Sequence, residues 1–552
     1  MVKTIHLISG SLIILLLLVN ITACKDEKPD EQTSIIKPQN IIPAPEKIIL
    51  SDDQVNISAE TVLYSDARFQ KAKDIVVKAI NHTAPFTLNQ FSTIQDNCDI
   101  LILYNENLTD NEYHIEIDSG KIIITAKSPQ SAFYAAQTFK QILWTAELDS
   151  TENTIKVQAV SIIDKPENEY RGFHIDLSRH FFPKEFVFRL IDQMAFYKMN
   201  KLQLHLTDDQ GWRIQIDKYP KLTSIGAYRT FNDQDSVCME KAKYDADYNF
   251  DPQFVNGSTY GGFYTKQDLR DIIDYAKDNF IDVIPEVDMP GHMSAAIRSY
   301  PELSLSCSGN INWGNEFSEP LCVCRPEVMQ FCYDVWDEVM ELFPYDYVHL
   351  GADEVEKSFW EQSADCQQFM QDNNMNHVNK IQSYFVDKMF EHISSKGKKM
   401  IAWDDIFVSN DDNIVNQVDP DITIMYWRDY KPESANYAAQ NGNSIVLTPW
   451  SWFYLSSDPT DENLKSLYEF NELSELSAQV INKKIGYQAC VWTEEIPSEA
   501  VFERYIFPRF QAYAELAWSK NKVWDSFIKR MPAHINYLKE NGIKYTESSY
   551  FK

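Results

Sequence analysis

From residue 170 onward, short apolar runs alternate with amphipathic helical patterns, and this alternation restricts the possible folds more than any other feature of the chain. Eight runs have the length and composition of buried strands, at residues 171–176, 201–206, 282–288, 347–353, 399–404, 422–427, 444–449 and 487–494. Helices are predicted between them, at residues 184–199, 266–279, 326–343, 378–395 and 432–440. No clear helical pattern separates the last two strands. Repeated strand–helix units require a parallel sheet, and eight units are the number that closes an α/β barrel.

Nearly every predicted strand ends in side chains that can transfer protons, form hydrogen bonds or stack on a ligand. These residues are Asp176, His205, Asp208, Glu286, Asp288, Asp353, Glu354, Trp403, Asp404, Trp427, Trp492 and Glu494. The carboxyl ends of the strands in a barrel converge on one face, where active sites lie. A doubly wound sheet also gathers strand ends, but the sequence lacks the glycine-rich phosphate loop of such sheets. We therefore predict a barrel.

Two adjacent acids, Asp353 and Glu354, are the most conspicuous of these strand-end residues. They close the apolar run 347–350, and a glycine just before them permits a close approach of backbone or ligand. Other acidic pairs, such as Asp52 and Asp53, lie among polar residues, as is typical of solvated loops. The position of Asp353 and Glu354 therefore favours a functional role.

Length and charge limit the number of domains and the partners. A chain of 552 residues exceeds one ordinary core, so we expect at least two domains, of which one is large enough for a barrel. The formal net charge of −30 disfavours nucleic acid and anionic membrane surfaces as partners, because polyanions are repelled. Neutral ligands remain compatible with this charge, and no cofactor is predicted.

Residues 1–23 are predicted to be a signal peptide rather than part of the fold. The apolar stretch 7–19 is too short for a membrane span and is followed by Ile21-Thr22-Ala23-Cys24, which resembles a bacterial lipobox. Cys24 would then be lipidated, and the polar residues 24–40 would form a tether. A plain secretory signal is the alternative. The expected location is the outer membrane, on the periplasmic or cell-surface side, with the lipid at Cys24 as the only membrane contact.

Residues 41–165 are predicted to form a small α+β domain of mixed sheet and helices, ahead of a catalytic barrel at residues 166–552. Alternating or apolar runs at 98–103, 114–117 and 121–125 predict strands, and residues 67–80 and 131–144 have helical patterns. The exported location permits disulfides. Cys307 with Cys322 or Cys324 would close a loop, but spacing does not decide the pairing.

Four sequence segments lie at the predicted strand ends and carry polar side chains in the same order as a known family. They are 171–181 (RGFHIDLSRHF), 205–212 (HLTDDQGW), 285–292 (PEVDMPGH) and 349–354 (HLGADE). These segments resemble glycoside hydrolase family 20, the β-N-acetylhexosaminidases. The similarity extends from Ile41-Ile42-Pro43-Ala44-Pro45 to Ala514-Glu515-Leu516-Ala517-Trp518, which covers nearly the whole chain after the tether.

The resemblance implies an exo-acting hydrolase that releases terminal β-linked GlcNAc or GalNAc from glycans. In this family the 2-acetamido oxygen of the substrate attacks the anomeric carbon, so no carboxylate nucleophile is needed. By resemblance, Asp353 would orient the acetamido group and stabilise the charge that develops on it. Glu354 would be the general acid and base, and Tyr454 would donate a hydrogen bond to the acetamido carbonyl. A like charge nearby would also raise the pKa of one acid of the pair.

The resemblance also implies roles in substrate binding for Arg179, Asp208 and His292. Arg179 would bind ring hydroxyls, with Asp208 in the same polar network. A purely structural ion pair between Arg179 and Asp208 is the alternative. His292 would support the hydrogen-bond network of the catalytic acid, and a structural histidine is the alternative.

A wall of aromatic side chains and one further acid complete the implied site. Trp403, Trp427 and Trp492 would enclose the acetamido methyl group and the sugar face, because aromatic faces stack on apolar ring faces. Glu494 would accept a hydrogen bond from a sugar hydroxyl. Each tryptophan taken singly can also be an ordinary core residue.

Two positions depart from the family pattern. Ser456 stands where the family usually has an Asp that binds a sugar hydroxyl, and Asp458 is a candidate substitute. Selectivity between gluco and galacto sugars is therefore open. Asp405 stands where a Glu is common.

Four other interpretations remain at this stage. One is a retaining glycosidase with a protein nucleophile such as Asp288. Another is a surface lipoprotein that binds glycans on the same fold without turnover. A metal site from His205, Asp208 and His292 is the third, since these are ligand types, although sugar-binding and network roles explain the residues better. The fourth is a calcium loop at residues 411–421, whose spacing fits a solvated loop better.

Overall fold

The computed structural model describes residues 40–551, apart from residues 85, 96, 119, 309–317 and 408–415. The predicted signal peptide, Cys24, nearly all of the tether and residues 411–415 of the acidic loop therefore lie outside the described residues. Among the residues that are described, no helix has the length and apolarity that a membrane crossing requires.

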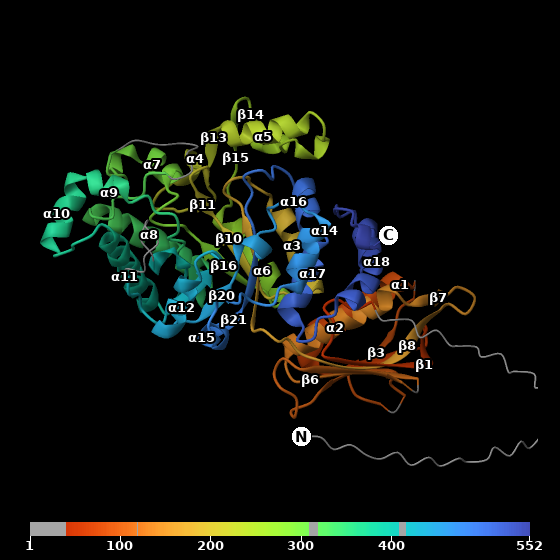
Figure 1. Cartoon of the computed structure of the whole chain (residues 1–552). Coiled ribbons are helices and arrows are strands. Elements are labelled where there is room, and N and C mark those ends of the chain that lie inside the picture. Colours follow the sequence, from red (N-terminus) through yellow and green to blue (C-terminus); the bar gives the residue numbers. More distant parts are fainter. Residues whose placement is uncertain are drawn as a thin grey trace, which may run out of the picture. The chain divides into compact units, whose positions relative to one another are not determined.

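The first domain is a mixed sheet with two helices on it (Figure 1). The strand order is β1-β8-β5-β6-β4-β2-β3, and β7 pairs with β8. The strands are β1 (Lys47–Ile57), β2 (Val62–Ser65), β3 (Asn89–Phe91), β4 (Ile100–Tyr104), β5 (Tyr113–Asp118), β6 (Lys121–Ala126), β7 (Glu147–Asp149) and β8 (Thr154–Asp164). The helices are α1 (Gln70–Thr83) and α2 (Pro129–Trp144). Every second residue of β5 is buried, so one face of this strand packs on the core.

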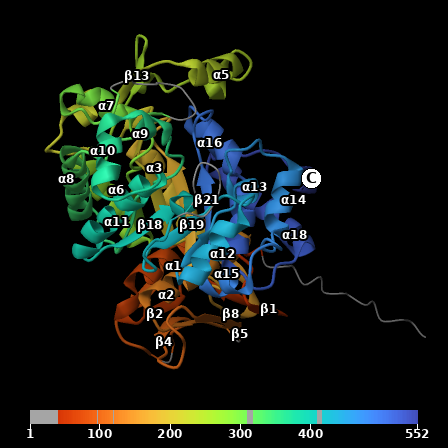
Figure 2. The same cartoon turned by 60° about the vertical axis from the view of Figure 1, so that its left-hand side comes forward.

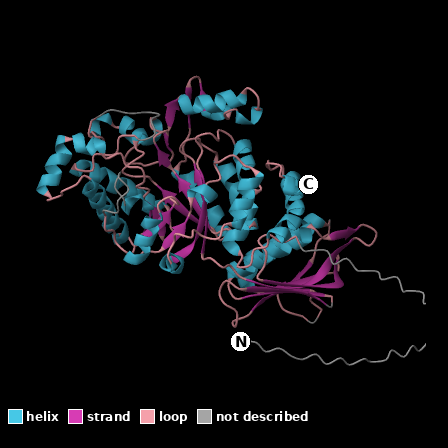
Figure 3. Ribbon diagram, viewed as in Figure 1, coloured by secondary structure: helices cyan, strands magenta, loops and turns pink. Residues whose placement is uncertain are grey.

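The second domain contains a closed barrel of eight parallel strands in the order β10-β16-β17-β18-β19-β20-β21-β9. Its strands are β9 (Tyr170–Asp176), β10 (Lys201–His205), β16 (Asp282–Glu286), β17 (Tyr347–His349), β18 (Lys399–Trp403), β19 (Thr423–Tyr426), β20 (Ile445–Leu447) and β21 (Lys484–Val491). The helices α3 (Lys184–Phe196), α6 (Lys266–Asp278), α8 (Pro326–Leu342), α11 (Asn379–Ser395), α12 (Pro432–Asn441), α16 (Glu499–Ile506) and α17 (Arg509–Trp518) follow the strands. Figures 2 and 3 show these helices around the strands. The predicted barrel is confirmed.

Shorter elements decorate the barrel. The small strands are β11 (Thr207–Asp208), β12 (Gly211–Trp212), β13 (Tyr228–Thr230), β14 (Val255–Asn256) and β15 (Thr259–Gly261). The additional helices are α4 (Lys221–Ser224), α5 (Asp233–Ala242), α7 (Ser294–Ser299), α9 (Ser358–Gln362), α10 (Ala364–Asp372), α13 (Trp450–Phe453), α14 (Asp461–Glu469), α15 (Ala478–Lys483) and α18 (Trp524–Glu540). Three of them, α13, α14 and α15, fill the interval between the last two strands, where the sequence showed no clear helical pattern.

One strand ends earlier than its apolar pattern predicts. The expected strand 347–353 stops at His349, because Gly351, Ala352 and Glu354 all have left-handed backbone conformations, with φ of 75°, 70° and 48°. The chain therefore turns out of the sheet just before the two acids.

Two disulfides tie together loops near the C-terminal ends of the strands. Cys307 pairs with Cys322, and Cys324 pairs with Cys366. The first pairing is one of the two that the sequence left open, and the second joins this loop to α10.

Candidate active site

A cavity of about 870 Å³ opens where the barrel strands end. It is lined by Arg179, Asp353, Glu354, Trp427, Tyr430, Trp450, Ser451, Tyr454, Ser456, Ser457, Asn463, Trp492 and Glu494. Seven of the ten residues predicted for catalysis or substrate binding are thus brought to one cavity, although they come from five different strand ends. The other three, Asp208, His292 and Trp403, lie directly behind the lining.

The turn after β17 presents Asp353 and Glu354 differently. A Cβ at Gly351 would meet Asp288 Oδ1 at 2.0 Å, and the φ of this residue is 75°, so the close approach of Asp288 requires a glycine. Ala352 N donates to Asp288 Oδ1 at 2.9 Å, which fixes the turn. The Asp353 side chain is 11% exposed, whereas that of Glu354 is 34% exposed. Glu354 is the acid that a ligand and water reach more easily.

Burial raises the pKa of Asp353 well above its usual range, and the neighbouring Asp288 carboxylate raises it further. The charge of His292 partly offsets both effects. The adjacent Glu354 contributes less to the shift than Asp288 does. A like charge therefore raises the pKa of one acid of the pair, as expected, but burial and Asp288 contribute more to the shift than Glu354 does.

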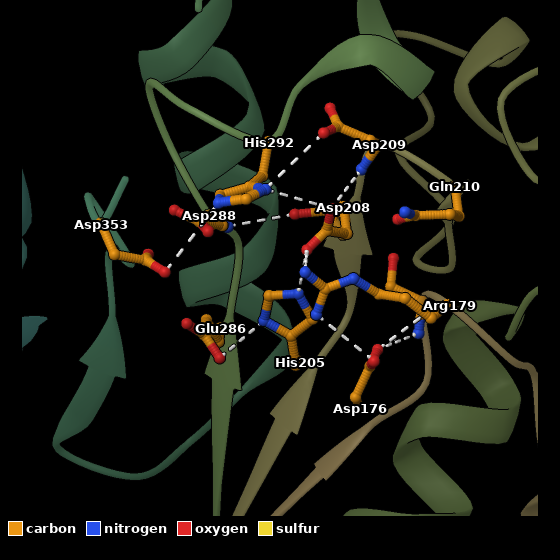
Figure 4. Close-up of polar contacts among 12 residues, drawn as sticks. Asp176, Arg179, His205, Asp208, Asp209, Gln210, Glu286, Asp288, His292 and Asp353 are labelled. Atoms are coloured by element: carbon orange, nitrogen blue, oxygen red, sulfur yellow. Dashed lines mark hydrogen bonds and ion pairs between the residues drawn. The ribbon is translucent and has the colours of Figure 1, made fainter. Parts of the chain in front are cut away.

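His292 connects Glu354 to the polar interior of the site. Figure 4 shows its imidazole between Asp353 and the pair Asp208 and Asp209. Its Nε2 lies 3.4 Å from Glu354 Oε2, and its Nδ1 lies 3.3 Å from Asp208 Oδ1. Burial alone would lower the pKa of His292, but the Asp208 carboxylate raises it well above the usual value. A protonated imidazole held in this position can donate to Glu354 and keep its carboxyl group oriented.

Arg179 is both paired and exposed to the cavity. Its Nη2 lies 2.8 Å from Asp208 Oδ2, and its Nη1 lies 3.4 Å from Asp176 Oδ2 and 3.8 Å from Glu494 Oε1. Burial would raise the pKa of Asp208, but Arg179 holds it well below its usual range. Arg179 therefore forms the structural ion pair and also faces the ligand-binding cavity. Its guanidinium group has more N–H donors than one carboxylate uses.

Glu286 is a buried acid whose importance the sequence did not indicate beyond its place at a strand end. His205 Nδ1 lies 2.9 Å from Glu286 Oε2, and His205 Nε2 lies 2.9 Å from Asp208 Oδ2. Trp403 Nε1 donates to Glu286 Oε1 at 2.8 Å. Glu286 thus supports both the Asp208 network and a tryptophan behind the cavity wall. The alternation of inward-facing residues along β16 was the available signal.

The aromatic wall consists of two layers. Trp427, Tyr454 and Trp492 line the cavity, and the ring centroids of Trp427 and Tyr454 are 6.1 Å apart with 20° between the planes. Trp403 is fully buried behind them, with its centroid 6.0 Å from that of Trp492. The expectation that Trp403 itself faces the cavity is therefore not what this structure shows.

Asp405 links the aromatic wall to the catalytic turn. Trp427 Nε1 donates to Asp405 Oδ2 at 2.7 Å, and Glu354 N donates to Asp405 Oδ1 at 3.4 Å. Asp405, which stands where a glutamate is common, thus accepts hydrogen bonds from both the Trp427 indole and the Glu354 backbone.

Ser456 lies in the lining, and its Oγ accepts a hydrogen bond from Trp492 N at 3.3 Å. Asp458, the candidate substitute for the missing acid, instead accepts a hydrogen bond from the Tyr505 hydroxyl at 3.1 Å and is not part of the lining. The polar groups in this part of the cavity are Ser456, Ser457 and Asn463, which are uncharged.

The position of Asp288 argues against a protein nucleophile there. Asp288 is 1% exposed, is not part of the lining, and accepts the hydrogen bond from Ala352 N. Its pKa is raised to about 7, with burial as the main cause.

The atoms of His205, Asp208 and His292 do not converge as one group of metal ligands among the described residues. Asp208 groups with Asp209 and His292, whereas His205 groups with His174 and Glu286.

Two family models match long, consecutive segments of the chain. The family model described as "Glycosyl hydrolase family 20, catalytic domain" matches residues 168–521, and "Glycosyl hydrolase family 20, domain 2" matches residues 38–165. A β-hexosaminidase of Porphyromonas gingivalis is 33% identical over 96% of the chain and 67% of its own length. The matched region therefore spans about two thirds of the length of this relative. It spans 66% of the length of a second β-hexosaminidase, from Vibrio furnissii.

Solved structures show the same fold. The exo-β-N-acetylglucosaminidase of Vibrio harveyi, solved with N-acetylglucosamine, matches with a TM-score of 0.80 at 29% identity, over 96% of this chain and 81% of that one. The β-N-acetylhexosaminidase of Bacteroides fragilis matches in fold with a TM-score of 0.75 at 24% identity, over 93% and 98%.

Proposed function

The chain belongs to glycoside hydrolase family 20, and on this basis we propose that it is an exo-acting β-N-acetylhexosaminidase that removes terminal β-linked GlcNAc or GalNAc from glycans. The observation that carries the proposal is the turn after β17, which places the exposed Glu354 and the buried Asp353 side by side at one cavity. Two acids in such different environments suit two different roles.

In the proposed reaction the substrate supplies its own nucleophile. The acetamido oxygen attacks the anomeric carbon and forms an oxazolinium ion, as the bond to the leaving oxygen breaks. Asp353 accepts the acetamido N–H and stabilises the positive charge, and Tyr454 donates to the acetamido oxygen. Trp427 and Trp492 enclose the methyl group, which keeps the reacting atoms together.

Glu354 handles the proton in both steps. It protonates the leaving oxygen first and then, as a carboxylate, takes a proton from the water that attacks the anomeric carbon. His292, held by Asp208, orients the carboxyl group. The product keeps the β configuration because the anomeric carbon is attacked twice.

The other end of the cavity is suited to bind the hydroxyl groups of one terminal sugar. Arg179 donates to ring hydroxyls and Glu494 accepts from them. Arg179 Nη1 lies 3.8 Å from Glu494 Oε1, so both residues are on the same part of the lining.

We also propose that the protein is exported and held at the outer membrane through a lipid on Cys24. This proposal rests on the lipobox-like sequence that ends at Cys24.

The deciding experiment compares terminal β-GlcNAc, β-GalNAc and 6-sulfated β-GlcNAc substrates with an analogue that lacks the acetamido group. We expect hydrolysis of the N-acetylated substrates and none of the analogue. Efficient cleavage of the analogue would contradict the substrate-assisted route. Binding of the glycans without any hydrolysis would favour the alternative of a non-catalytic glycan-binding lipoprotein. The ratio among the three N-acetylated substrates reports the effect of Ser456.

A further inference from the structure

Aromatic rings form a continuous series from the interior of the cavity to its mouth. Successive ring centroids are 6.1 Å apart from Trp492 to Tyr454, 6.1 Å from Tyr454 to Trp427, 6.1 Å from Trp427 to Tyr430 and 6.4 Å from Tyr430 to Trp450. The inner three rings are partly buried and belong to the proposed site for the terminal sugar. The outer two rings have no role in the reaction proposed above.

The outer two rings are unusually exposed. Tyr430 is 54% exposed and Trp450 is 53% exposed, although both line the cavity. Among the tryptophans that the structure describes, Trp450 is the one classed as exposed. Large aromatic side chains that remain exposed next to a binding cavity are typical of recognition surfaces, because they bind with little loss of side-chain entropy.

The backbone holds these two rings in place before any ligand arrives. Tyr430 lies in the loop after β19, and Trp450 begins α13 after β20. Trp450 N donates to Trp427 O at 2.9 Å, and Ser451 N donates to Asp429 Oδ2 at 2.9 Å. These two bonds join the loop after β19 to the start of α13, so a ligand does not have to order the backbone that carries the rings.

The position of Glu354 decides which part of a substrate meets these rings. An acid that protonates the leaving oxygen lies on the leaving-group side of the scissile bond. Glu354 lines the same cavity as both rings. Burial is the main cause that raises the pKa of Tyr430, and Glu354 is among the nearby charges that raise it further. Asp405 also connects Glu354 N with the indole of Trp427, the ring next to Tyr430. In the proposed complex the terminal sugar lies against the inner three rings, so the rest of the glycan extends past the outer two.

We propose that Tyr430 and Trp450 form a binding platform for the sugar ring next to the terminal residue, on the leaving-group side, and that the platform selects neutral sugars. The proposal rests on the proposed function. A cavity of about 870 Å³ lies in the upper part of the range that encloses drug-sized ligands, so there is room for more than one sugar. The Asp429 carboxylate between the loops makes this rim unfavourable for sulfated or acidic rings.

The test compares two substrates that share a terminal β-GlcNAc. One is a disaccharide with a neutral second sugar, and the other is the methyl glycoside, whose leaving group has no ring. We expect Trp450→Ala to lower kcat/KM for the disaccharide about tenfold, mainly through KM, because loss of one stacked ring is worth roughly that factor. The methyl glycoside is expected to change little, since it does not reach the platform.

Three further variants separate stacking from general damage. Trp450→Phe keeps a ring and is expected to retain most of the activity on the disaccharide, and Tyr430→Ala is expected to share the selective loss. Tyr104→Ala removes a half-exposed ring from the first domain and is expected to change neither substrate. A disaccharide with a sulfated second sugar is expected to be hydrolysed less efficiently than the neutral one.

The possible outcomes are distinct. An equal loss on both substrates, or no loss on the disaccharide, would overturn the platform while leaving the proposed function intact. Preference for the sulfated disaccharide would overturn the selection of neutral sugars. If the wild-type protein hydrolysed neither substrate, the proposed function itself would fail, and the platform would fail with it.

Discussion

The inner end and the mouth of the cavity are built from different kinds of interaction. At the inner end, Arg179, Asp208 and His292 are buried and held by ion pairs at 2.8–3.4 Å. At the mouth, Tyr430 and Trp450 are half exposed, and their loops are joined by one backbone hydrogen bond and one bond to the Asp429 carboxylate. Paired charges hold the reacting groups in a fixed geometry, as proton transfer requires, whereas exposed rings tolerate many partners. The comparison suggests that the inner end determines the reaction and the mouth determines which glycan is used.

The largest effects should come from the two acids, and they should differ in kind. Glu354→Gln is expected to lower kcat/KM for a disaccharide by about 10²–10⁴-fold, because the leaving oxygen loses its acid. For a dinitrophenyl glycoside, the kcat/KM of the same variant should be close to that of the wild type, because that leaving group needs no proton. Asp353→Asn is expected to lower kcat/KM by about 10²–10³-fold on both substrates, since it stabilises charge on the acetamido group.

Steady-state kinetics of both variants on both substrates test this assignment of roles. If Asp353→Asn spared the activated substrate and Glu354→Gln did not, the roles of the two acids would be reversed. The uncatalysed hydrolysis rate of the dinitrophenyl glycoside, measured in parallel, sets the baseline.

Stability should separate the buried network from the surface. Arg179→Met leaves Asp176, Asp208 and Glu494 without their shared cation, and breaking a buried pair in this way costs about 3–5 kcal/mol. Thermal and denaturant unfolding of the variant measure the loss. Arg68→Met is the matched control, because it removes an exposed Arg–Asp pair of similar distance, 2.7 Å, and should change the stability little. Equal effects of the two variants would show that the inner network is not preorganised by charge.

Much of the barrel could be predicted from sequence, and much of the network behind the site could not. The strand at Lys399–Trp403 and the acids at 353 and 354 follow from local patterns, because apolar strands and their polar ends occupy consecutive residues. The hydrogen bond from Trp403 to Glu286 spans 117 positions, and no local pattern encodes such a contact. The helix α14 was missed because its short apolar stripe lies in a polar stretch.

The early end of β17 and the burial of Trp403 illustrate the same limit. The apolar run to residue 350 looks like a longer strand, but the left-handed conformations after His349 depend on Asp288, which belongs to another strand end. Trp403 ends a strand as predicted, yet its hydrogen bond to Glu286 draws the indole behind the wall. In both cases a buried acid from β16 or the loop after it decides the outcome.

The last expected effect depends on pH and concerns Asp288, whose Oδ1 accepts a hydrogen bond from the catalytic turn at Ala352 N. Its pKa is raised from the ordinary 3.8 to about 7 in the folded protein, chiefly because it is buried. Between these values the folded state holds a proton that the unfolded state has released, so this group's contribution to stability is full below about pH 4 and is lost as the pH rises through 7. The limiting slope for one proton is about 1.4 kcal/mol per pH unit. Asp288→Asn keeps the acceptor for Ala352 N but cannot ionise.

Unfolding free energies of the wild type and of Asp288→Asn, measured from pH 4 to 8, isolate this contribution as their difference. The difference should move in favour of the variant as the pH rises and become constant above about pH 7. Parallel curves would mean that Asp288 is ionised throughout, and that the turn tolerates a buried charge beside Asp353. The charge of Asp288 would then account for more of the raised pKa of Asp353. Electrostatic interactions would in that case matter even more at the inner end of the cavity than at the mouth.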